Sequence, residues 1–293
     1  MYERDISKLF IVLLVIFYMK RFDKILKDIK DIKIQGANSI AREGVNAYLL
    51  QPDENSAKKI LKTRPTEPLM QNAIRFLLKS KNKKAAAKEF FSYTKLSEKK
   101  IAKYGSTLIK KDMNIFTHCH SSSVVDILKH AKKARKDFVV YNTETEPLMQ
   151  GRKTANELAR AGIKVIHVPD TAVEYSLKKC DLFLFGADAF LKKGVINKIG
   201  TKMYCEIADL YNIPRYSCGV SLKFTKKIKM ELRKGKELWA ERQKNIEVLN
   251  PAFDLVNKKL ISGVVSEFGV LGYGSFIKKA AENLKKFSYS KGR

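Results

Sequence analysis

The sequence predicts an α/β fold, with a helical N-terminal domain followed by a Rossmann-like, doubly wound parallel sheet domain. Up to residue 111 the apolar residues recur at helical spacing, whereas from residue 112 onward short apolar runs alternate with amphipathic segments. Such alternation of strands and helices is typical of a parallel sheet that helices cover on both faces. A chain of 293 residues, 45% of them hydrophobic, is long enough for two domains. We therefore expect domains at residues 19–111 and 112–293.

Two turn-forming motifs interrupt the helical domain. Residues 35–38 (Gln-Gly-Ala-Asn) separate an amphipathic segment from a helix predicted at Ser39–Leu50. Residues 64–66 (Arg-Pro-Thr) precede a further helix, with apolar residues from Leu69 to Leu77. The helix predicted at residues 90–108 connects the two domains.

In the second domain, the apolar runs predict six strands and the segments between them predict four helices. The strands are expected at residues 114–117, 138–142, 164–168, 182–186, 214–220 and 263–266. The helices are expected at residues 122–133, 154–161, 171–178 and 198–211. Because ligands of such sheets bind beyond the carboxyl ends of the strands, we expect the functional site there.

Residues 1–18 are predicted to be an N-terminal extension, as a start codon placed too early would produce. Their apolar run at residues 9–18 is about half of the ~20 residues that a membrane-spanning helix needs. No small-residue cleavage site of the kind that ends a signal peptide follows it. A membrane anchor is the alternative interpretation.

The composition disfavours several classes of protein. The four cysteines form no CxxC pair and have no zinc-ligand spacing, so we expect reduced thiols in a cytoplasmic protein. The net charge of +28 is spread along the chain, and no RNA-binding motif with interleaved aromatic residues accompanies it. We therefore expect neither a specific nucleic-acid partner nor a membrane partner.

A cysteine follows the first predicted strand of the second domain. Cys119 lies between that strand and a helix whose N-terminus contains a serine triplet beginning at Ser121. The N–H groups and dipole of a helix N-terminus favour both a thiolate and a bound phosphate. The residue is interpreted either as a reactive cysteine beside an anion site or as a small buried residue with polar caps around it.

Polar residues also follow the second and fourth predicted strands. Glu144 and Gln150 are expected either to face a polyhydroxylated ligand or to cap their loop. Asp188 is a candidate general acid or base, with a turn-forming role as the alternative. Asn197 and Lys198 are expected at a junction between a loop and a helix, where they hold a phosphate or lie at the surface.

Taken together, five segments of the sequence resemble the superfamily of translation initiation factor 2B subunits and sugar-phosphate isomerases. The segments are Thr117–Ser121, Glu144–Ala155, Gly186–Asp188, Gly194–Thr201 and Asn250–Asp254. The resemblance covers about residues 19–275, including the motifs at residues 34–37 and 64–66. Among the enzymes of the superfamily, the sequence is most similar to archaeal ribose-1,5-bisphosphate isomerases.

The resemblance implies an aldose–ketose isomerase that converts ribose 1,5-bisphosphate to ribulose 1,5-bisphosphate and needs no metal and no other cofactor. The enzymes carry a Cys after the first sheet strand and an Asp after a later one, and here these are Cys119 and Asp188. Cys119 would move a proton between C2 and C1 while Asp188 serves ring opening and the hydroxyl groups, or the two roles are exchanged. The substrate-binding residues that the resemblance implies are Gly36, Ala37, Arg64, Ser121, Gln150, Asn197, Lys198 and Lys223.

Two positions depart from the pattern of the enzymes, which tend to carry Arg where Gln35 and Glu146 stand in this chain. Replacing a phosphate-binding cation by an amide or a carboxylate changes what the site can bind. One alternative is an alpha-type regulatory subunit that binds a nucleotide or sugar phosphate without turnover and contacts an initiation factor. Another is a methylthioribose-1-phosphate isomerase. Under each interpretation the family implies a homo-oligomer, either a dimer or a hexamer.

Overall fold

The computed structural model describes residues 18–289, which form two compact units. The first unit comprises the residues up to Ser92 together with those from Lys285 onward, and the second runs from Tyr93 to Leu284. The division falls inside helix α5 (Lys83–Ser106), so the helix predicted to connect the domains contributes to both units. The extension predicted at residues 1–18 lies outside the described residues except for Tyr18, which is helical.

The first unit is helical, as predicted. Residues 18–30 form a helix, and α2 (Ala37–Leu50), α3 (Glu54–Thr63), α4 (Pro68–Lys79) and the start of α5 follow it. Helix α2 packs against α3 and α4 and buries Ile40, Val45 and Tyr48. The apolar pattern did not predict α3, which begins after Asp53, whose carboxylate accepts the N–H of Ser56 at 2.8 Å.

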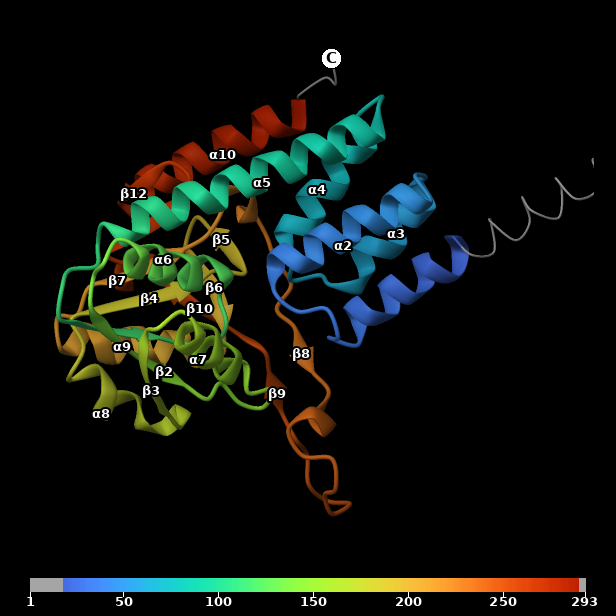
Figure 1. The fold of residues 1–293 in the computed structure, drawn as a ribbon. Helices are drawn as coiled ribbons and strands as arrows, with labels where there is room; N and C mark the ends of the chain where they lie inside the picture. The colour runs from blue at the N-terminus through green and yellow to red at the C-terminus, as the bar shows by residue number, and fades with distance from the viewer. Residues whose placement is uncertain (1–17, 290–293) are drawn as a thin grey trace, which may run out of the picture. The chain divides into compact units, whose positions relative to one another are not determined.

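The second unit is built on a seven-stranded sheet in the order β12-β11-β7-β4-β1-β2-β3 (Figure 1). All neighbouring strands are parallel except the edge pair β11 and β12. This arrangement confirms the predicted α/β class. The strands are β1 (Met113–Thr117), β2 (Phe138–Thr143), β3 (Lys164–Val168), β4 (Leu182–Gly186), β7 (Arg215–Cys218), β11 (Gly263–Ser266) and β12 (Gly269–Leu271).

The direction of strand addition reverses at β1. This strand pairs with β2 on one side and with β4 on the other, so the chain first builds the sheet toward β3 and then returns to build it toward β12. In doubly wound sheets the ligand-binding crevice lies beyond the carboxyl ends of the strands at this reversal. The segments that follow β1 and β4 therefore border the expected crevice.

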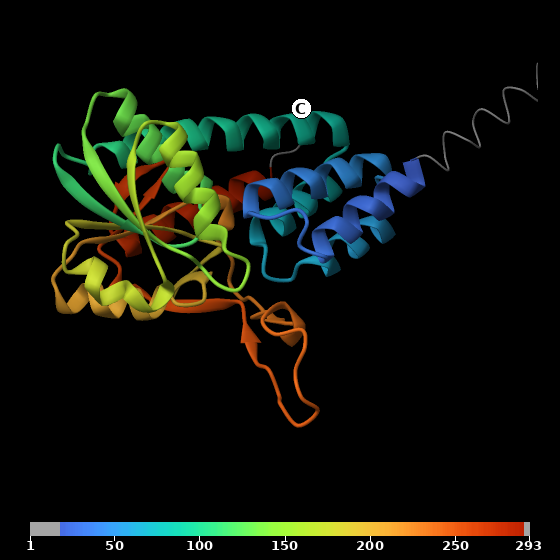
Figure 2. The same cartoon turned by 60° about the horizontal axis from the view of Figure 1, so that its bottom comes forward.

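Helices cover both faces of the sheet. Helix α6 (Ser122–Lys133) packs against α7 (Gln150–Arg160), while α8 (Val173–Leu177) packs against α9 (Thr201–Leu210) on the opposite side (Figure 2). The final helix, α10 (Tyr273–Tyr289), was not predicted. Its residues Tyr273, Phe276, Ile277 and Ala280 join the apolar core of the second unit. Between residues 18 and 289, no helix combines the length and the apolar character needed to cross a membrane.

Most predicted elements of the sheet domain are present, but the segment after β4 differs. Strands β3, β4 and β11 and helix α6 span the predicted residues. Residues 194–197, predicted as a loop, and Lys198, predicted to begin a helix, instead form the strand β6 (Gly194–Lys198). It pairs with β5 (Ala189–Leu191) and β10 (Phe253–Asn257) in a small antiparallel sheet. Asn197 and Lys198 therefore lie at the end of a strand, because α9 begins only at Thr201.

Another small sheet lies at the base of a projecting segment of the second unit. Strands β8 (Leu232–Arg233) and β9 (Asn250–Pro251) pair antiparallel, and the chain between them extends away from the main sheet (Figures 1 and 2). We call residues 225–249 the arm. Its exposed large apolar residues are Met230, Leu232, Leu238, Trp239, Ile246 and Leu249.

Candidate active site at the strand reversal

Cys119 lies directly beyond the carboxyl end of β1, in the left-handed backbone conformation with φ of 67°. Its N–H donates to the Thr145 hydroxyl at 3.0 Å, and its carbonyl accepts the Thr154 hydroxyl at 2.9 Å. A non-glycine residue is uncommon in this conformation, so these two hydrogen bonds hold the backbone in place. Cys119 is partly exposed, whereas the cysteines at positions 180, 205 and 218 are buried.

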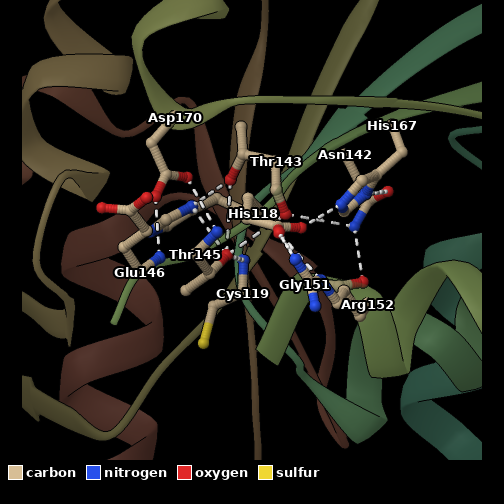
Figure 3. Close-up of polar contacts among 11 residues, drawn as sticks. His118, Cys119, Asn142, Thr143, Thr145, Glu146, Gly151, Arg152, His167 and Asp170 are labelled. Carbon is tan, nitrogen blue, oxygen red and sulfur yellow. Dashed lines mark hydrogen bonds and ion pairs between the residues drawn. The ribbon is translucent and has the colours of Figure 1, made fainter. Parts of the chain in front are cut away.

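Asp170, which follows β3, holds the loop that contains Thr145. Its carboxylate accepts the N–H of Thr145 at 2.9 Å and the N–H of Glu146 at 2.7 Å. Burial by itself raises the pKa of Asp170, but the hydrogen bonds from these two N–H groups counteract it, and the pKa lies below its ordinary value. Figure 3 shows Asp170 and Thr145 in one network with His118, while the Cys119 thiol points away from that network.

His118 is buried and neutral. Burial lowers its pKa to about 4. One ring nitrogen, Nε2, lies 3.0 Å from the carbonyl oxygen of Ile199, and the other, Nδ1, lies 2.7 Å from the Thr143 hydroxyl. A carbonyl oxygen only accepts, so Nε2 carries the proton and Nδ1 accepts the Thr143 hydroxyl. His118 therefore connects the end of β1 to the segment that follows β6.

His120, on the other side of Cys119, has the opposite tautomer. Its Nδ1 lies 3.1 Å from the Thr154 hydroxyl, which already donates its proton to the Cys119 carbonyl, so Nδ1 must be the donor. Burial, reinforced by Lys153, lowers the pKa of His120 to about 4. Both histidines that flank Cys119 are thus neutral at neutral pH and serve to connect segments.

Cys119, Lys198 and Asp188 form one electrostatic group. Although Cys119 is partly exposed as a residue, desolvation of its side chain raises the pKa of the thiol to about 12; Lys198 opposes this rise and Asp188 adds to it. Burial lowers the pKa of Lys198, whereas Cys119 and Asp188 both raise it. The three side chains are therefore close enough to act on one another, and the thiol is protonated at neutral pH.

Asn197 and Ser121 lie at the same edge of the sheet, around the end of β4. The Asn197 amide, oriented so that its nitrogen faces acceptors, donates to the Gly186 carbonyl and to Oδ2 of Asp188, both at 3.3 Å. A Cβ on Gly186 would lie 2.8 Å from Oγ of Ser121. Ser121 also caps α6 by accepting the N–H of Val124, so the start of α6 packs directly on β4.

Lys223 contacts the segment that leads to Asp188. It is buried, and its ammonium donates to the Ala187 carbonyl at 2.6 Å. The turn of 3-10 helix that contains it, Ser221–Lys223, is anchored by Glu267, whose carboxylate accepts the N–H of Ser221 at 3.0 Å and the hydroxyls of Ser221 and Tyr93. Glu267 thus fixes the turn from which Lys223 extends.

Gln150 and Glu144 both follow β2, but they differ in their hydrogen bonding. Gln150 is the first residue of α7, and its amide oxygen is buried without a hydrogen-bond partner among residues 18–289. Glu144 is paired with Arg152 and His167, so it connects its loop to α7 and β3. Arg152 and His167 lie together at one side of the network in Figure 3.

The remaining predicted ligand residues belong to the first unit. Gly36 has φ of 81° and precedes α2, which begins at Ala37, and its carbonyl accepts the N–H of Ile40 at 3.0 Å. Arg64 is buried, with its Nη2 3.2 Å from Oε1 of the buried Glu67. Within that unit, both motifs occupy the segments that precede helices α2 and α4.

His118, Thr145 and Asp170 are site residues that the sequence motifs did not identify. Asp170 follows the third strand directly after Pro169, so the expectation that functional residues follow strands applies to it as well. His118 and Thr145 lie inside the motifs that contain Cys119 and Glu144. Their roles depend on hydrogen bonds between different loops, which a linear pattern does not reveal.

Known proteins were compared with the whole chain. The sequence model of the initiation factor 2 subunit family matches residues 29–272. A ribose 1,5-bisphosphate isomerase of Thermococcus kodakarensis is 32% identical over 86% of this chain and 91% of its own length. A putative translation initiation factor eIF-2B subunit 2-like protein of Pyrococcus furiosus is 32% identical over 85% of this chain and 95% of its own length.

The fold agrees with these sequence matches. The solved structure of the translation initiation factor eIF-2B of Pyrococcus horikoshii OT3 has a TM-score of 0.79 at 27% identity, and covers 86% of this chain and 97% of its own. The resemblance that the motifs indicate is thereby confirmed over both compact units. The chain belongs to the initiation factor 2 subunit family.

Proposed function

We propose that this chain is a sugar-phosphate isomerase that converts ribose 1,5-bisphosphate to ribulose 1,5-bisphosphate. The observation that supports it most is the mutual influence of Cys119, Asp188 and Lys198 at the strand reversal, where doubly wound sheets bind ligands. Relatives named ribose 1,5-bisphosphate isomerase match most of the chain at about 30% identity, which supports the isomerase class.

The reaction moves protons without a net change in composition. The ring oxygen gains a proton as its bond to C1 breaks. The proton on C2 is removed, and one returns to C1 through an enediol-like intermediate. The C2 hydroxyl then loses its proton to give the ketone. One group must shuttle between C2 and C1, and another must serve the oxygens.

Cys119 and Asp188 are suited to these two tasks. Because the thiol is protonated at neutral pH, Cys119 must lose its proton before it can accept the one on C2. Asp188 is the neighbouring carboxylate that can take this proton, and Lys198 stabilises the thiolate that remains. The protonated Asp188 then supplies the proton for the ring oxygen and later accepts the one from the C2 hydroxyl.

The remaining predicted residues would bind the substrate. The N-terminus of α6 with Ser121 offers N–H groups and a favourable dipole to a phosphate. The buried, unpartnered amide oxygen of Gln150 would accept a substrate hydroxyl. Asn197, Lys198 and Lys223 would contact the hydroxyls or a phosphate. Gly36, Ala37 and Arg64 would provide the phosphate contacts of the first unit.

A turnover assay tests the proposal. Ribulose 1,5-bisphosphate should form from ribose 1,5-bisphosphate with the parent chain and be lost with Cys119→Ser and with Asp188→Asn. The control Asp137→Asn, which removes an exposed carboxylate paired with Lys132, should keep its turnover. If the parent gives no product with or without AMP, the assignment is wrong, and methylthioribose 1-phosphate is the next substrate to test.

A regulatory subunit is the second candidate, and one observation favours it. The eIF-2B structure of Pyrococcus horikoshii superposes on most of this chain. In that case the chain would bind a nucleotide or sugar phosphate without converting it, and would contact an initiation factor. Isothermal titration that detects binding of a sugar phosphate or AMP, together with absent turnover, supports this candidate over the isomerase.

We further propose that the chain forms a homo-oligomer. Several large apolar side chains of the arm are exposed, with Leu232 and Leu249 each about two thirds accessible. Single exposed apolar residues are common, but a projecting segment with several of them is typical of a surface that packs against another chain.

A further inference from the structure

Arg233 lies on β8, at the base of the arm, with its side chain turned inward. That side chain is only 12% exposed, whereas the next residue, Lys234, is exposed. Side chains alternate between the two faces of a strand, so Glu231 and Arg233 share the inner face while Leu232 and Lys234 share the outer one. A mostly buried arginine needs an anionic partner, and Glu231 on the same face provides one.

A ladder of backbone hydrogen bonds connects Arg233 to Lys198. Arg233 pairs with Asn250 in the β8–β9 sheet. The N–H of Ala252 donates to the Glu231 carbonyl at 3.2 Å, and the N–H of Ile199 donates to the Ala252 carbonyl at 3.0 Å. Ala252 therefore lies between the inner face of β8 and the end of β6, directly after Lys198. Arg233 and Lys198 thus come from two strands, β8 and β6, that pair with consecutive parts of one segment: Arg233 pairs with Asn250, and Lys198 pairs with Phe253.

The charges support the same placement. Arg233 lowers the pKa of Lys198, in addition to the larger lowering that burial causes, so the two cations repel each other. Nε of Arg233 lies 3.2 Å from Oε1 of Glu231, and this ion pair orients the planar guanidinium. A guanidinium held in this way matches the geometry of a phosphate, which it binds through two parallel hydrogen bonds.

We propose that Arg233 is a phosphate-binding residue of the Cys119 site, where it holds one phosphate of the substrate together with Lys198. This inference rests on the proposed function, because it assigns a substrate group to the same site. It gives the arm a role in catalysis, since its first strand carries a side chain that touches the ligand. A phosphate between the two cations would also relieve their mutual repulsion.

Steady-state kinetics with ribose 1,5-bisphosphate tests this role. Arg233→Gln should raise KM by about 10-fold to 100-fold, as expected for the loss of charged hydrogen bonds, with a smaller change in kcat. Arg233→Lys should recover part of the loss, because a point charge replaces the bidentate fork. Lys234→Gln removes the same charge from the outer face and should leave KM unchanged. Equal KM values for Arg233→Gln and the parent would overturn the proposal.

A second measurement does not require turnover. Iodoacetamide should alkylate Cys119, the one partly exposed cysteine among residues 18–289, and its rate at about pH 9 can be followed by peptide mass spectrometry. Inorganic phosphate should slow the alkylation, and Arg233→Gln should need a several-fold higher phosphate concentration for the same protection, unlike Lys234→Gln. If protection depends on Arg233 while ribose 1,5-bisphosphate is not converted, the substrate assignment fails and the phosphate site stands. If phosphate gives no protection, or protects Arg233→Gln equally, the site is refuted.

Discussion

At the scale of single residues, the position of Cys119 could be predicted but its conformation could not. The strand before it and the serine triplet after it place the residue at the carboxyl edge of the sheet. Its positive φ depends on the hydroxyls of Thr145 and Thr154, which come from a different loop and a different helix. These contacts form only when β1 and β2 pair in register, so no local pattern in the sequence contains them.

Asp170 should be essential for this arrangement without touching the substrate. We expect Asp170→Asn to lower the free energy of unfolding by about 1–3 kcal/mol, because the carboxylate accepts two backbone N–H groups and an amide side chain offers one acceptor. We also expect kcat to fall more than KM rises, because the loop that holds Cys119 loosens. Urea unfolding and steady-state kinetics measure the two effects.

The pH dependence of that change provides a control. The pKa of Asp170 is lower in the folded chain than in the unfolded chain, so its stabilising contribution is complete above about pH 4 and is lost as the pH falls below that. The difference in stability between the parent and Asp170→Asn should therefore be constant near neutral pH and shrink in acid. Asp23→Asn, at an exposed position of the helix at residues 18–30, should change neither stability nor kcat.

At the scale of elements, the parallel strands could be predicted and the small antiparallel sheet could not. Strand β4 is a continuous apolar run and is buried throughout, which is the pattern of a strand covered on both faces, and β11 is buried as well. Strand β6 begins at a glycine and ends in Asn197 and Lys198, so its polar end was interpreted as a loop. Its pairing with β10 joins segments more than fifty residues apart, and such pairing depends on tertiary structure rather than on local pattern.

Gly151, at the start of α7, allows a test of how closely α7 packs on β2. A Cβ on Gly151 would lie 1.7 Å from the carbonyl oxygen of Thr143 and 2.9 Å from that of Glu144, so Gly151→Ala must push the helix away from β2. We expect a loss of about 2–4 kcal/mol in the free energy of unfolding, with turnover reduced because Gln150 and Thr154 move with α7.

A matched variant separates the clash from the loss of glycine itself. A Cβ on Gly274, in α10, meets nothing within 4 Å. Gly274→Ala should therefore be neutral or stabilise the chain by about 0.4–1 kcal/mol, because alanine restricts the unfolded chain. Thermal unfolding of both variants tests this difference. Equal melting temperatures for Gly151→Ala and Gly274→Ala would contradict the packing of α7 on β2.

At the scale of the whole molecule, the two neutral histidines should make stability depend on pH. Burial lowers the pKa of both His118 and His120 to about 4, so the unfolded chain binds protons more readily between about pH 6.5 and pH 4. Their contribution is complete above about pH 6.5 and is lost as the pH falls toward 4. At pH 5 each histidine should cost up to about 2 kcal/mol relative to pH 7. Urea unfolding at the two pH values measures this loss. The variant His120→Asn keeps an N–H donor near Thr154, and its free energy of unfolding should fall less between pH 7 and pH 5 than that of the parent.

The charge of the molecule sets the conditions under which the proposed homo-oligomer should form. Each copy carries a net charge of +28, so two copies repel each other, and salt screens that repulsion. Between about 0.01 M and about 1 M NaCl the Debye length falls from about 30 Å to about 3 Å, so the average mass from light scattering should stay equal or rise as salt is added.

Trp239, the sole tryptophan of the chain, is 48% exposed on the arm, and its emission should shift to shorter wavelength if the arm is buried between subunits. A rise in mass without that shift places the interface elsewhere, and a mass of 33.4 kDa at every salt concentration contradicts the oligomer.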